Sequence, residues 1–150
     1  MNNEKLKLLA MDLTVGYPRS PRELLGGYVI VARCLDKCRS SLVGENGSYK
    51  FWPCSLCKSL ITFTGIDRDA FSDFVATCAS DEEVGEWVKA RSQVKNPTEI
   101  IRWNNKMREM RISELPDELQ EHLEADMQSL PMHRPVYVWF DIFDLEEGRL

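Results

Sequence analysis

The chain has 150 residues, a formal net charge of −5 and five cysteines. A chain of this length buries about 68–70% of the surface that its unfolded form exposes, so we expect one domain over residues 1–150. No run approaches the ~18 apolar residues of a membrane-spanning helix, and the apolar run after Lys7 is too short for a signal peptide. These features predict a cytoplasmic protein with no membrane partner, whose cysteines are reduced.

The charged side chains are unevenly distributed. Residues 1–111 carry 17 basic and 14 acidic side chains, whereas residues 112–150 carry 2 and 10. Nucleic-acid binding requires a concentrated basic face. The basic residues of a predicted helix over 97–111 are diluted by Glu99 and Glu109, which is typical of a solvated face and argues against a nucleic-acid partner.

The strongest helix signal follows Ser20. The sequence Ser-Pro-Arg-Glu is the pattern of a capping box with proline at the first helical position. Apolar residues then recur at helical spacing. We therefore predict a helix from about 21 to 42, which places Gly26 and Gly27 in its interior.

The rest of the chain shows shorter amphipathic patterns with clear start signals. The predicted helices begin at Ser55, after Asp67, after Ser80, at Pro97 and at Pro116. The β-branched and aromatic residues 136–140 favour a strand, but a lone strand without a partner is unstable. We therefore expect an extended segment there, followed by one or two helical turns after Asp141. The predicted fold class is all-α, with about six helices in one compact bundle-like domain and a loosely ordered N-terminus over 1–11.

Several segments together resemble a bacterial family of small proteins that open with D-L-T…P-R-S-P…L-G-G-Y. The segments are DLTVGYPRSPRELLGGYVIVARCLDKCR, GSYKFWPCSL, FTGIDRDAF, ASDEEVGEWV and NPTEI. The family is catalogued as a domain of unknown function, so the resemblance implies a single small cytosolic domain and no particular activity. Family members read C-P-L followed by an acidic residue where this chain has Cys54-Ser55-Leu56-Cys57, so the C-x-x-C spacing departs from the family pattern.

Four of the cysteines fall in two closely spaced pairs. Cys34 and Cys38 lie one helical turn apart, and Cys54 and Cys57 have the spacing of a zinc knuckle or a redox pair. The first pair lacks knuckle spacing, and free cysteine is among the most buried residue types. We therefore predict structural thiols and no metal or cofactor. A zinc site on these four residues and a redox dithiol are the open alternatives.

The start of the predicted 21–42 helix is a candidate anion site, because a helix N-terminus attracts anions and two arginines flank it. Each glycine within the helix costs roughly 1 kcal/mol relative to alanine, and something should offset that cost. A ligand close to the backbone would do so, although close packing of another element against the glycines is the favoured explanation. The candidate ligand-binding residues are Arg19, Arg22, Gly26, Gly27, Tyr28 and Arg33.

The sequence contains no Ser-His-Asp, H-E-x-x-H or dinucleotide-binding signature. We therefore predict a non-enzymatic binding or self-association module, with a second copy or another protein as its partner. The first alternative is a pocket for a small anionic ligand, or an enzymatic pocket, at the Arg19–Arg33 segment. The second alternative is a structural zinc site.

Overall fold

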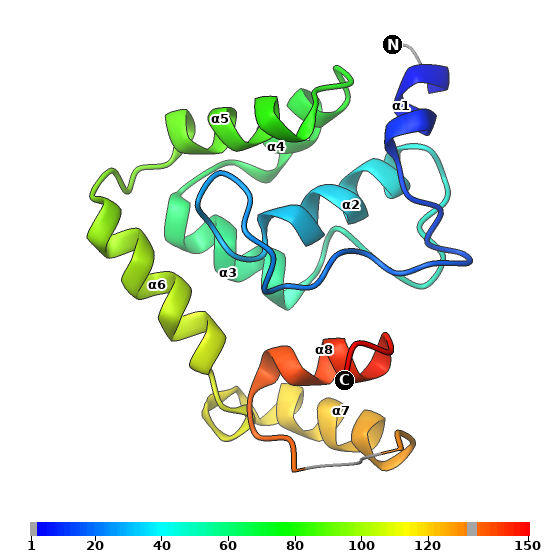
Figure 1. The fold of residues 1–150 in the computed structure, drawn as a ribbon, viewed down its shortest axis with the longest axis vertical. Helices are drawn as coiled ribbons and strands as arrows, with labels where there is room; N and C mark the ends of the chain where they lie inside the picture. The colour runs from blue at the N-terminus through cyan, green and yellow to red at the C-terminus, as the bar shows by residue number, and fades with distance from the viewer. Residues whose placement is uncertain (1–2, 132–134) are drawn as a thin grey trace. The chain divides into compact units, whose positions relative to one another are not determined.

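The computed structural model describes residues 3–131 and 135–150 and confirms the all-α fold class (Figure 1). Over these residues the chain forms eight α-helices and one 3₁₀ helix, and it forms isolated β-bridges but no strand. None of the described helices is both long and apolar enough to cross a membrane. The helices are α1 Asn3–Leu9, α2 Val31–Leu42, α3 Ser55–Thr64, α4 Arg68–Val75, α5 Asp81–Arg91, α6 Pro97–Glu109, η1 Ile112–Glu114, α7 Asp117–Gln128 and α8 Trp139–Glu146.

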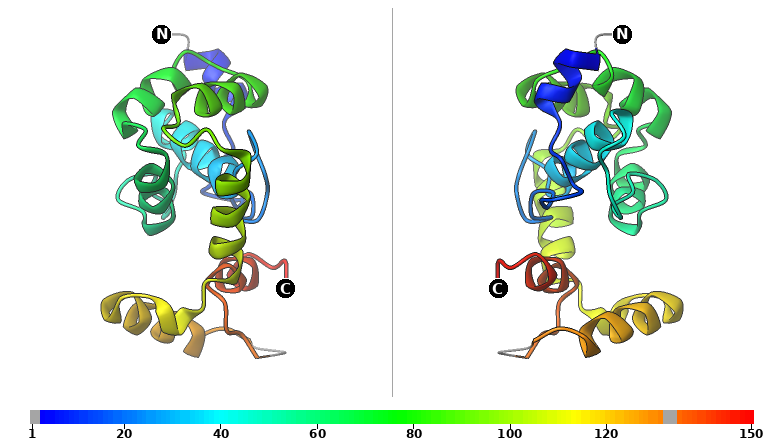
Figure 2. Two further views of the ribbon diagram at one scale, coloured as in Figure 1. Left: turned by 90° about the vertical axis from the view of Figure 1, so that its left-hand side faces the viewer. Right: turned by 90° about the vertical axis from the view of Figure 1, so that its right-hand side faces the viewer.

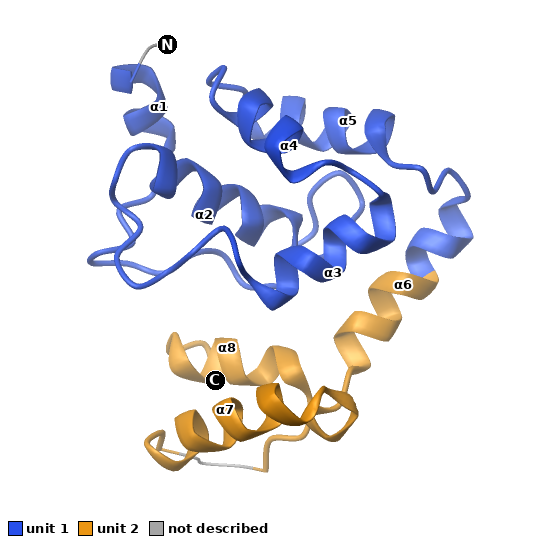
Figure 3. Cartoon of the chain, turned by 180° about the vertical axis from the view of Figure 1, so that it is seen from behind, with its two compact units in different colours: residues 1–101 blue, residues 102–150 orange. Residues whose placement is uncertain are grey.

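The chain divides within α6 into two compact units, Met1–Ile101 and Arg102–Leu150 (Figure 3). The expectation of a single domain stays a prediction. The first unit contains α1 to α5 and the first turns of α6, and the second contains the rest of α6, η1, α7 and α8.

Helix α2 is the centre of the first unit, where α1, α3 and α4 all pack against it (Figure 2). Every residue from Val31 to Ser40 is buried, on all sides of the helix. Four of these buried residues are charged, namely Arg33, Asp36, Lys37 and Arg39. Because a buried charge is costly unless it is paired, α2 requires polar partners from the elements around it.

Two predicted helix starts are confirmed in atomic detail. The Asp67 side chain accepts a hydrogen bond from the backbone N–H of Ala70 at the start of α4. Ser80 and Glu83 form the full capping box of α5, each side chain bonding to the other's backbone N–H. The ring of Trp87 on α5 stacks on Phe74 of α4, so aromatic packing joins these two helices.

In the second unit the segment just before α8 is extended, but the helix begins earlier than predicted, at Trp139 and not after Asp141. Val138 forms an isolated antiparallel bridge with Arg111, and the N–H of Trp139 donates to the carbonyl of Met110 at 2.8 Å. Helix α8 then begins at Trp139. The extended segment therefore finds its partner in the strand-like residues just before η1.

The predicted helix from 21 to 42 is wrong in its first half, because α2 begins only at Val31. Ser20 caps no helix, and its hydroxyl accepts a bond from the N–H of Arg22 within a local turn. Leu25 and Tyr28 instead exchange both backbone hydrogen bonds across a two-residue turn, at 3.0 and 3.1 Å. The residues between them, Gly26 and Gly27, both have positive φ, which suits glycine pairs in such tight turns.

The two glycines of this turn have different surroundings. A Cβ on Gly26 would lie 2.7 Å from the carbonyl oxygen of Gly85, so the turn packs directly on the backbone of α5. A Cβ on Gly27 would meet nothing within 4 Å. Close packing against a neighbouring element, the favoured explanation for the pair, therefore applies to Gly26 and not to Gly27.

Residues 3–9 form a helix that the sequence analysis did not predict. Helix α1 spans Asn3–Leu9, where we expected a loosely ordered segment, and it packs on α2. Its one buried side chain, Leu6, is completely inaccessible to solvent. A single well-placed leucine therefore fixes a helix too short to be stable alone.

The different surroundings of the two glycines lead to a test. Gly26→Ala should destabilise the protein by about 3 kcal/mol, because it combines a strained positive φ with a clash against Gly85. Gly27→Ala, with a similar φ and open space, should cost only about 1 kcal/mol. Urea unfolding of both variants measures the difference, and equal destabilisation would contradict the packing role of Gly26.

Candidate functional site

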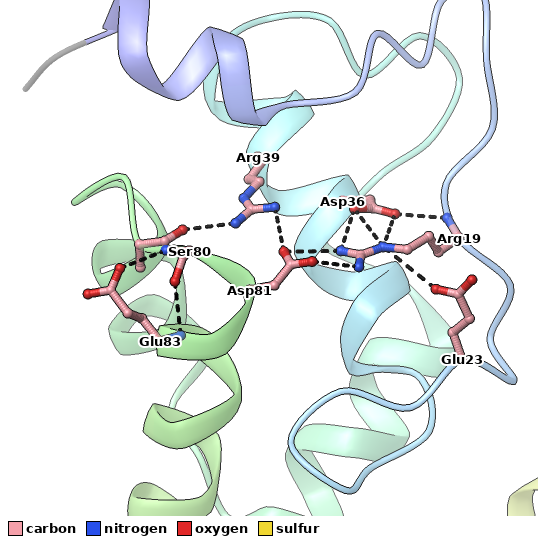
Figure 4. A network of polar contacts seen from close by, with 8 residues as sticks. Arg19, Glu23, Asp36, Arg39, Ser80, Asp81 and Glu83 are labelled. Carbon is pink, nitrogen blue, oxygen red and sulfur yellow. Dashed lines mark hydrogen bonds and ion pairs between the residues drawn. The ribbon is translucent and has the colours of Figure 1, made fainter.

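Arg19, one of the predicted anion-binding residues, is held by a buried carboxylate (Figure 4). Its Nη2 and Nε atoms donate to the two oxygens of Asp36 at 2.9 and 3.0 Å, and its backbone N–H donates to Asp36 Oδ2 at 2.8 Å. The Asp36 side chain is only 3% exposed. This bidentate pair therefore anchors the segment before the glycine turn to the middle of α2.

Asp81, in the first turn of α5, extends this pair into a network. Figure 4 shows its carboxylate between two guanidinium groups, 2.8 Å from Arg19 Nη1 and 2.9 Å from Arg39 Nη1. Arg39 also donates to the carbonyl of Ala79 at 2.8 Å, just before the α5 cap. Two arginines and two aspartates thus neutralise one another, and we call Arg19, Asp36, Arg39 and Asp81 the ion network.

The ion network changes the titration of Asp81. Desolvation raises the pKa of this carboxyl, but the hydrogen bonds from Arg19 and Arg39 outweigh desolvation and hold the pKa below its usual range. The charged form of Asp81 is therefore favoured in the folded protein.

The other predicted arginines also have structural surroundings. Arg33 is 2% exposed, donates from Nη1 to the carbonyl of Arg19 at 3.1 Å, and lies over the ring of Tyr49. Arg22 is half-buried in the turn that follows Ser20. The anion site was predicted at a helix N-terminus near Pro21, and that N-terminus does not exist, since α2 begins ten residues later. Ligand binding by these residues stays a prediction.

The three remaining predicted residues line an open groove of about 410 Å³ in the first unit. Gly26, Gly27 and Tyr28 form one wall, and the other comes from the end of α5, the connector and the start of α6. The residues of this groove are Gly26, Gly27, Tyr28, Lys89, Val94, Lys95, Pro97, Ile100 and Ile101. We call it the α5–α6 groove.

The base of the α5–α6 groove is fixed by one buried side chain. Tyr28 is fully buried and donates from its hydroxyl to Ser92 Oγ at 2.9 Å. Ser92 Oγ in turn accepts the backbone N–H of Val94 at 3.1 Å. The glycine turn and the α5–α6 connector are therefore joined through a single hydroxyl pair, and the groove is preformed.

Two lysines supply the charge of the groove. Lys95 Nζ donates to the carbonyls of Lys89 and Ala90 at 3.0 and 2.9 Å, at the C-terminal end of α5. Lys89 forms a long, exposed ion pair with Glu86 at 3.7 Å. None of the nine groove residues is acidic, and four of them are aliphatic or proline. The groove therefore has the chemistry to receive a molecule with an apolar body and a negative group.

The structure separates Cys38 from the other three cysteines of the zinc alternative. Cys34 and Cys57 lie with their sulfurs 2.7 Å apart, and Cys54 hydrogen bonds to Cys57. Cys38 instead bonds to Ser72 of α4, and burial raises its pKa to about 12. Within the described ranges, no group of three or more His, Cys, Asp or Glu side chains is arranged to hold a metal ion. The four thiolates therefore do not form a common tetrahedral site.

Sequence reasoning missed both lysines of the groove. Neither belongs to a recognisable motif, and each lies about 60 residues from the glycine turn in the sequence. Their proximity to the turn follows from the contact between Gly26 and Gly85, which only the folded structure reveals. The one sequence signal was indirect, namely a glycine within the otherwise regular helix after Ser80.

A family described as "Domain of unknown function (DUF5069)" matches residues 15–149, nearly the whole chain. The match covers the ion network, the α5–α6 groove and the thiols together. No curated protein matches the chain in sequence.

The ion network predicts a pH-dependent stability. Because folding lowers the pKa of Asp81, the stability that this carboxylate contributes is fully present above about pH 4. This stability is lost as the pH falls through the folded-state pKa. Asp81→Asn should lower the free energy of unfolding by about 2 kcal/mol at pH 7, and by less at pH 2. Urea unfolding between pH 2 and pH 7 measures both values.

The matched control for Asp81→Asn is Asp69→Asn, whose carboxylate is largely exposed and forms an ion pair with its neighbour Arg68. This substitution should change the free energy of unfolding by no more than about 0.5 kcal/mol at every pH. If Asp81→Asn lowers the free energy of unfolding by the same amount from pH 2 to pH 7, the role of the ion network is contradicted.

Proposed function

Since the chain belongs to the DUF5069 family, whose description names no function, we propose from the geometry that it is a binding module for a small amphipathic anion. The bound molecule has an apolar body and one carboxylate, phosphate or sulfonate group. It occupies the α5–α6 groove, with the negative group on Lys95 and the apolar body against the aliphatic wall. The position of Lys95 is the observation that carries this proposal.

Lys95 is a preorganised cation. Its ammonium has three donors, and two of them bond to the carbonyls that end α5. The side chain is therefore held in one conformation before any ligand arrives, which reduces the entropy that binding would lose. The third donor and the full charge remain for an anion, because carbonyls do not neutralise an ammonium.

The aliphatic residues of the groove support an apolar contact. Ile100 and Ile101 lie in the first turns of α6, and Ile101 is 56% exposed. An exposed isoleucine is unremarkable alone, but here it borders a groove together with Val94 and Pro97. The volume of about 410 Å³ falls in the range of small-molecule sites.

The open side of the glycine turn supports access to the groove. Gly27 is exposed, and its missing side chain leaves space that a larger residue would fill. This proposal keeps the glycines and Tyr28 of the predicted ligand site. It replaces the three arginines, because Arg19 is neutralised by carboxylates and Arg33 is buried.

Decanoate is a suitable probe, because it combines a ten-carbon chain with one carboxylate. Lys95→Met should weaken decanoate binding about tenfold, which corresponds to about 1.4 kcal/mol for a charge-assisted hydrogen bond. Binding of decanol, the uncharged analogue, should change less than twofold. Isothermal titration calorimetry at low and high salt measures both.

Lys50→Met is the matched control, because Lys50 is exposed and lies outside the groove. It should bind decanoate like the original protein. The proposal fails if decanoate does not bind at millimolar concentration, or if Lys95→Met and Lys50→Met have equal affinities. Equal binding of decanoate and decanol by the original protein would contradict the role of the charge.

A further inference from the structure

Three thiols and one lysine meet where α2 faces the start of α3. Cys34 and Lys37 lie one turn apart on α2. Cys54 is the N-cap residue of α3, and Cys57 lies in its first turn. The two helices pack together, so four chemically active side chains from two elements form one cluster.

The cluster has a buried end and an accessible end. Cys34 and Cys57 are 2% and 1% exposed, with their sulfurs 2.7 Å apart. Cys54 is partly buried and hydrogen bonds to Cys57. An oxidising reagent in solution can therefore reach Cys54 first. The Cys57 thiol behind it is close to both Cys54 and Cys34.

Lys37 is the feature that plain core packing does not explain. Its side chain is 6% exposed, and its ammonium donates to Cys54 Sγ at 2.9 Å. Among the described residues no carboxylate pairs with this ammonium. A buried ammonium is costly beside a neutral thiol, whereas a thiolate would compensate it.

We propose that Cys34, Cys54 and Cys57 form a thiol–disulfide exchange site. In this site Cys54 reacts with a low-molecular-weight disulfide, and the oxidised protein contains a disulfide between Cys34 and Cys57. This activity is independent of the α5–α6 groove and shares no residue with it.

The reaction proceeds in three exchanges. The Cys54 thiolate attacks a disulfide RSSR, which forms a Cys54–SR bond and releases RS⁻. The Cys57 thiolate then attacks the Cys54 sulfur and releases a second RS⁻, which leaves a Cys54–Cys57 disulfide. Finally the Cys34 thiolate attacks the Cys57 sulfur and returns Cys54 to the thiolate form.

Atoms and electrons balance over the three steps. Two protein thiols are oxidised, one RSSR is reduced to two RSH, and the two protons lost by the protein are taken up by the RS⁻ groups. To bond, the sulfurs of Cys34 and Cys57 must approach by roughly 0.7 Å, since a disulfide bond is about 2.05 Å long. A small cavity of about 10 Å³ lined by both residues gives them room to move.

Lys37 acts as a positioning residue in this scheme. The hydrogen bond to Cys57 and burial raise the pKa of Cys54, and the nearby ammonium reduces this rise without cancelling it. The ammonium also stabilises Cys54 each time it leaves as a thiolate. Exchange should therefore accelerate with pH above neutrality, because the thiolate fraction grows as the thiol ionises.

The test is to treat the full-length protein with oxidised glutathione, then quench with acid, denature and alkylate with N-ethylmaleimide. Intact mass should show three adducts in place of the five of the untreated protein. Peptide mapping should place the disulfide between Cys34 and Cys57. The rate should rise several-fold per pH unit between pH 7 and pH 9.

Variants distinguish the roles of the three thiols. Cys54→Ser should slow formation of the disulfide at least tenfold, because the accessible thiol is lost. Cys57→Ser should stop at a mixed disulfide of Cys54 with glutathione. Lys37→Met should slow the reaction about fivefold at both pH 7 and pH 9, because the pKa of Cys54 is raised above this range. Cys78→Ser, which removes a cysteine outside the cluster, should oxidise at the original rate.

Three outcomes would overturn the proposal. All five thiols of the original protein could remain free, the disulfide could involve Cys38 or Cys78, or Cys54→Ser could oxidise at the original rate. A final Cys54–Cys57 disulfide would overturn the role of Cys34. The original protein alone decides the first and second outcomes and the Cys54–Cys57 outcome, so an unfolded variant cannot leave the proposal untested.

Discussion

The arrangement of the first unit depends on the pairing of charges that α2 buries. Asp36 has almost no access to water, so its charge requires a cation, and Arg19 supplies one through its side chain and its backbone N–H. Asp81 then links Arg19 to Arg39. Removing one member of the ion network leaves a buried charge uncompensated. The geometry of the network is therefore far more restricted than the geometry of apolar packing. The network thereby holds α2, the start of α5 and the segment before the glycine turn in fixed positions.

This constraint explains why the predicted anion site and the α5–α6 groove use different cations. Arg19, just before the glycine turn, balances carboxylates, so its charge is already neutralised within the protein. Among the described residues, Lys95 in the groove bonds to carbonyl oxygens, which orient an ammonium without cancelling its charge. Whether a cationic side chain is available to a ligand therefore depends on whether its hydrogen-bond acceptors are charged. The presence of a basic residue alone does not show this.

Local signals were sufficient to predict much of the fold from sequence. Asp67 and Ser80 cap their helices as expected, because each cap needs only residues within one turn. Ser20 has the same pattern and begins no helix, since positive φ at Gly26 and Gly27 turns the chain back before a helix can form. The candidate site was half predicted: the glycines and Tyr28 line the groove, but the cations come from contacts distant in sequence, which periodicity and caps do not encode.

Helix α2 has no face in contact with water from Val31 to Ser40, which is unusual in a helix with four charged residues. Its backbone amides can exchange their hydrogens with solvent only when the surrounding structure opens. The exchange rates of these amides therefore report the free energy of that opening, whereas exchange at helix ends reports only local fraying. The same helix carries Cys34 and Lys37, so the opening that exchange reports also exposes two side chains of the thiol cluster.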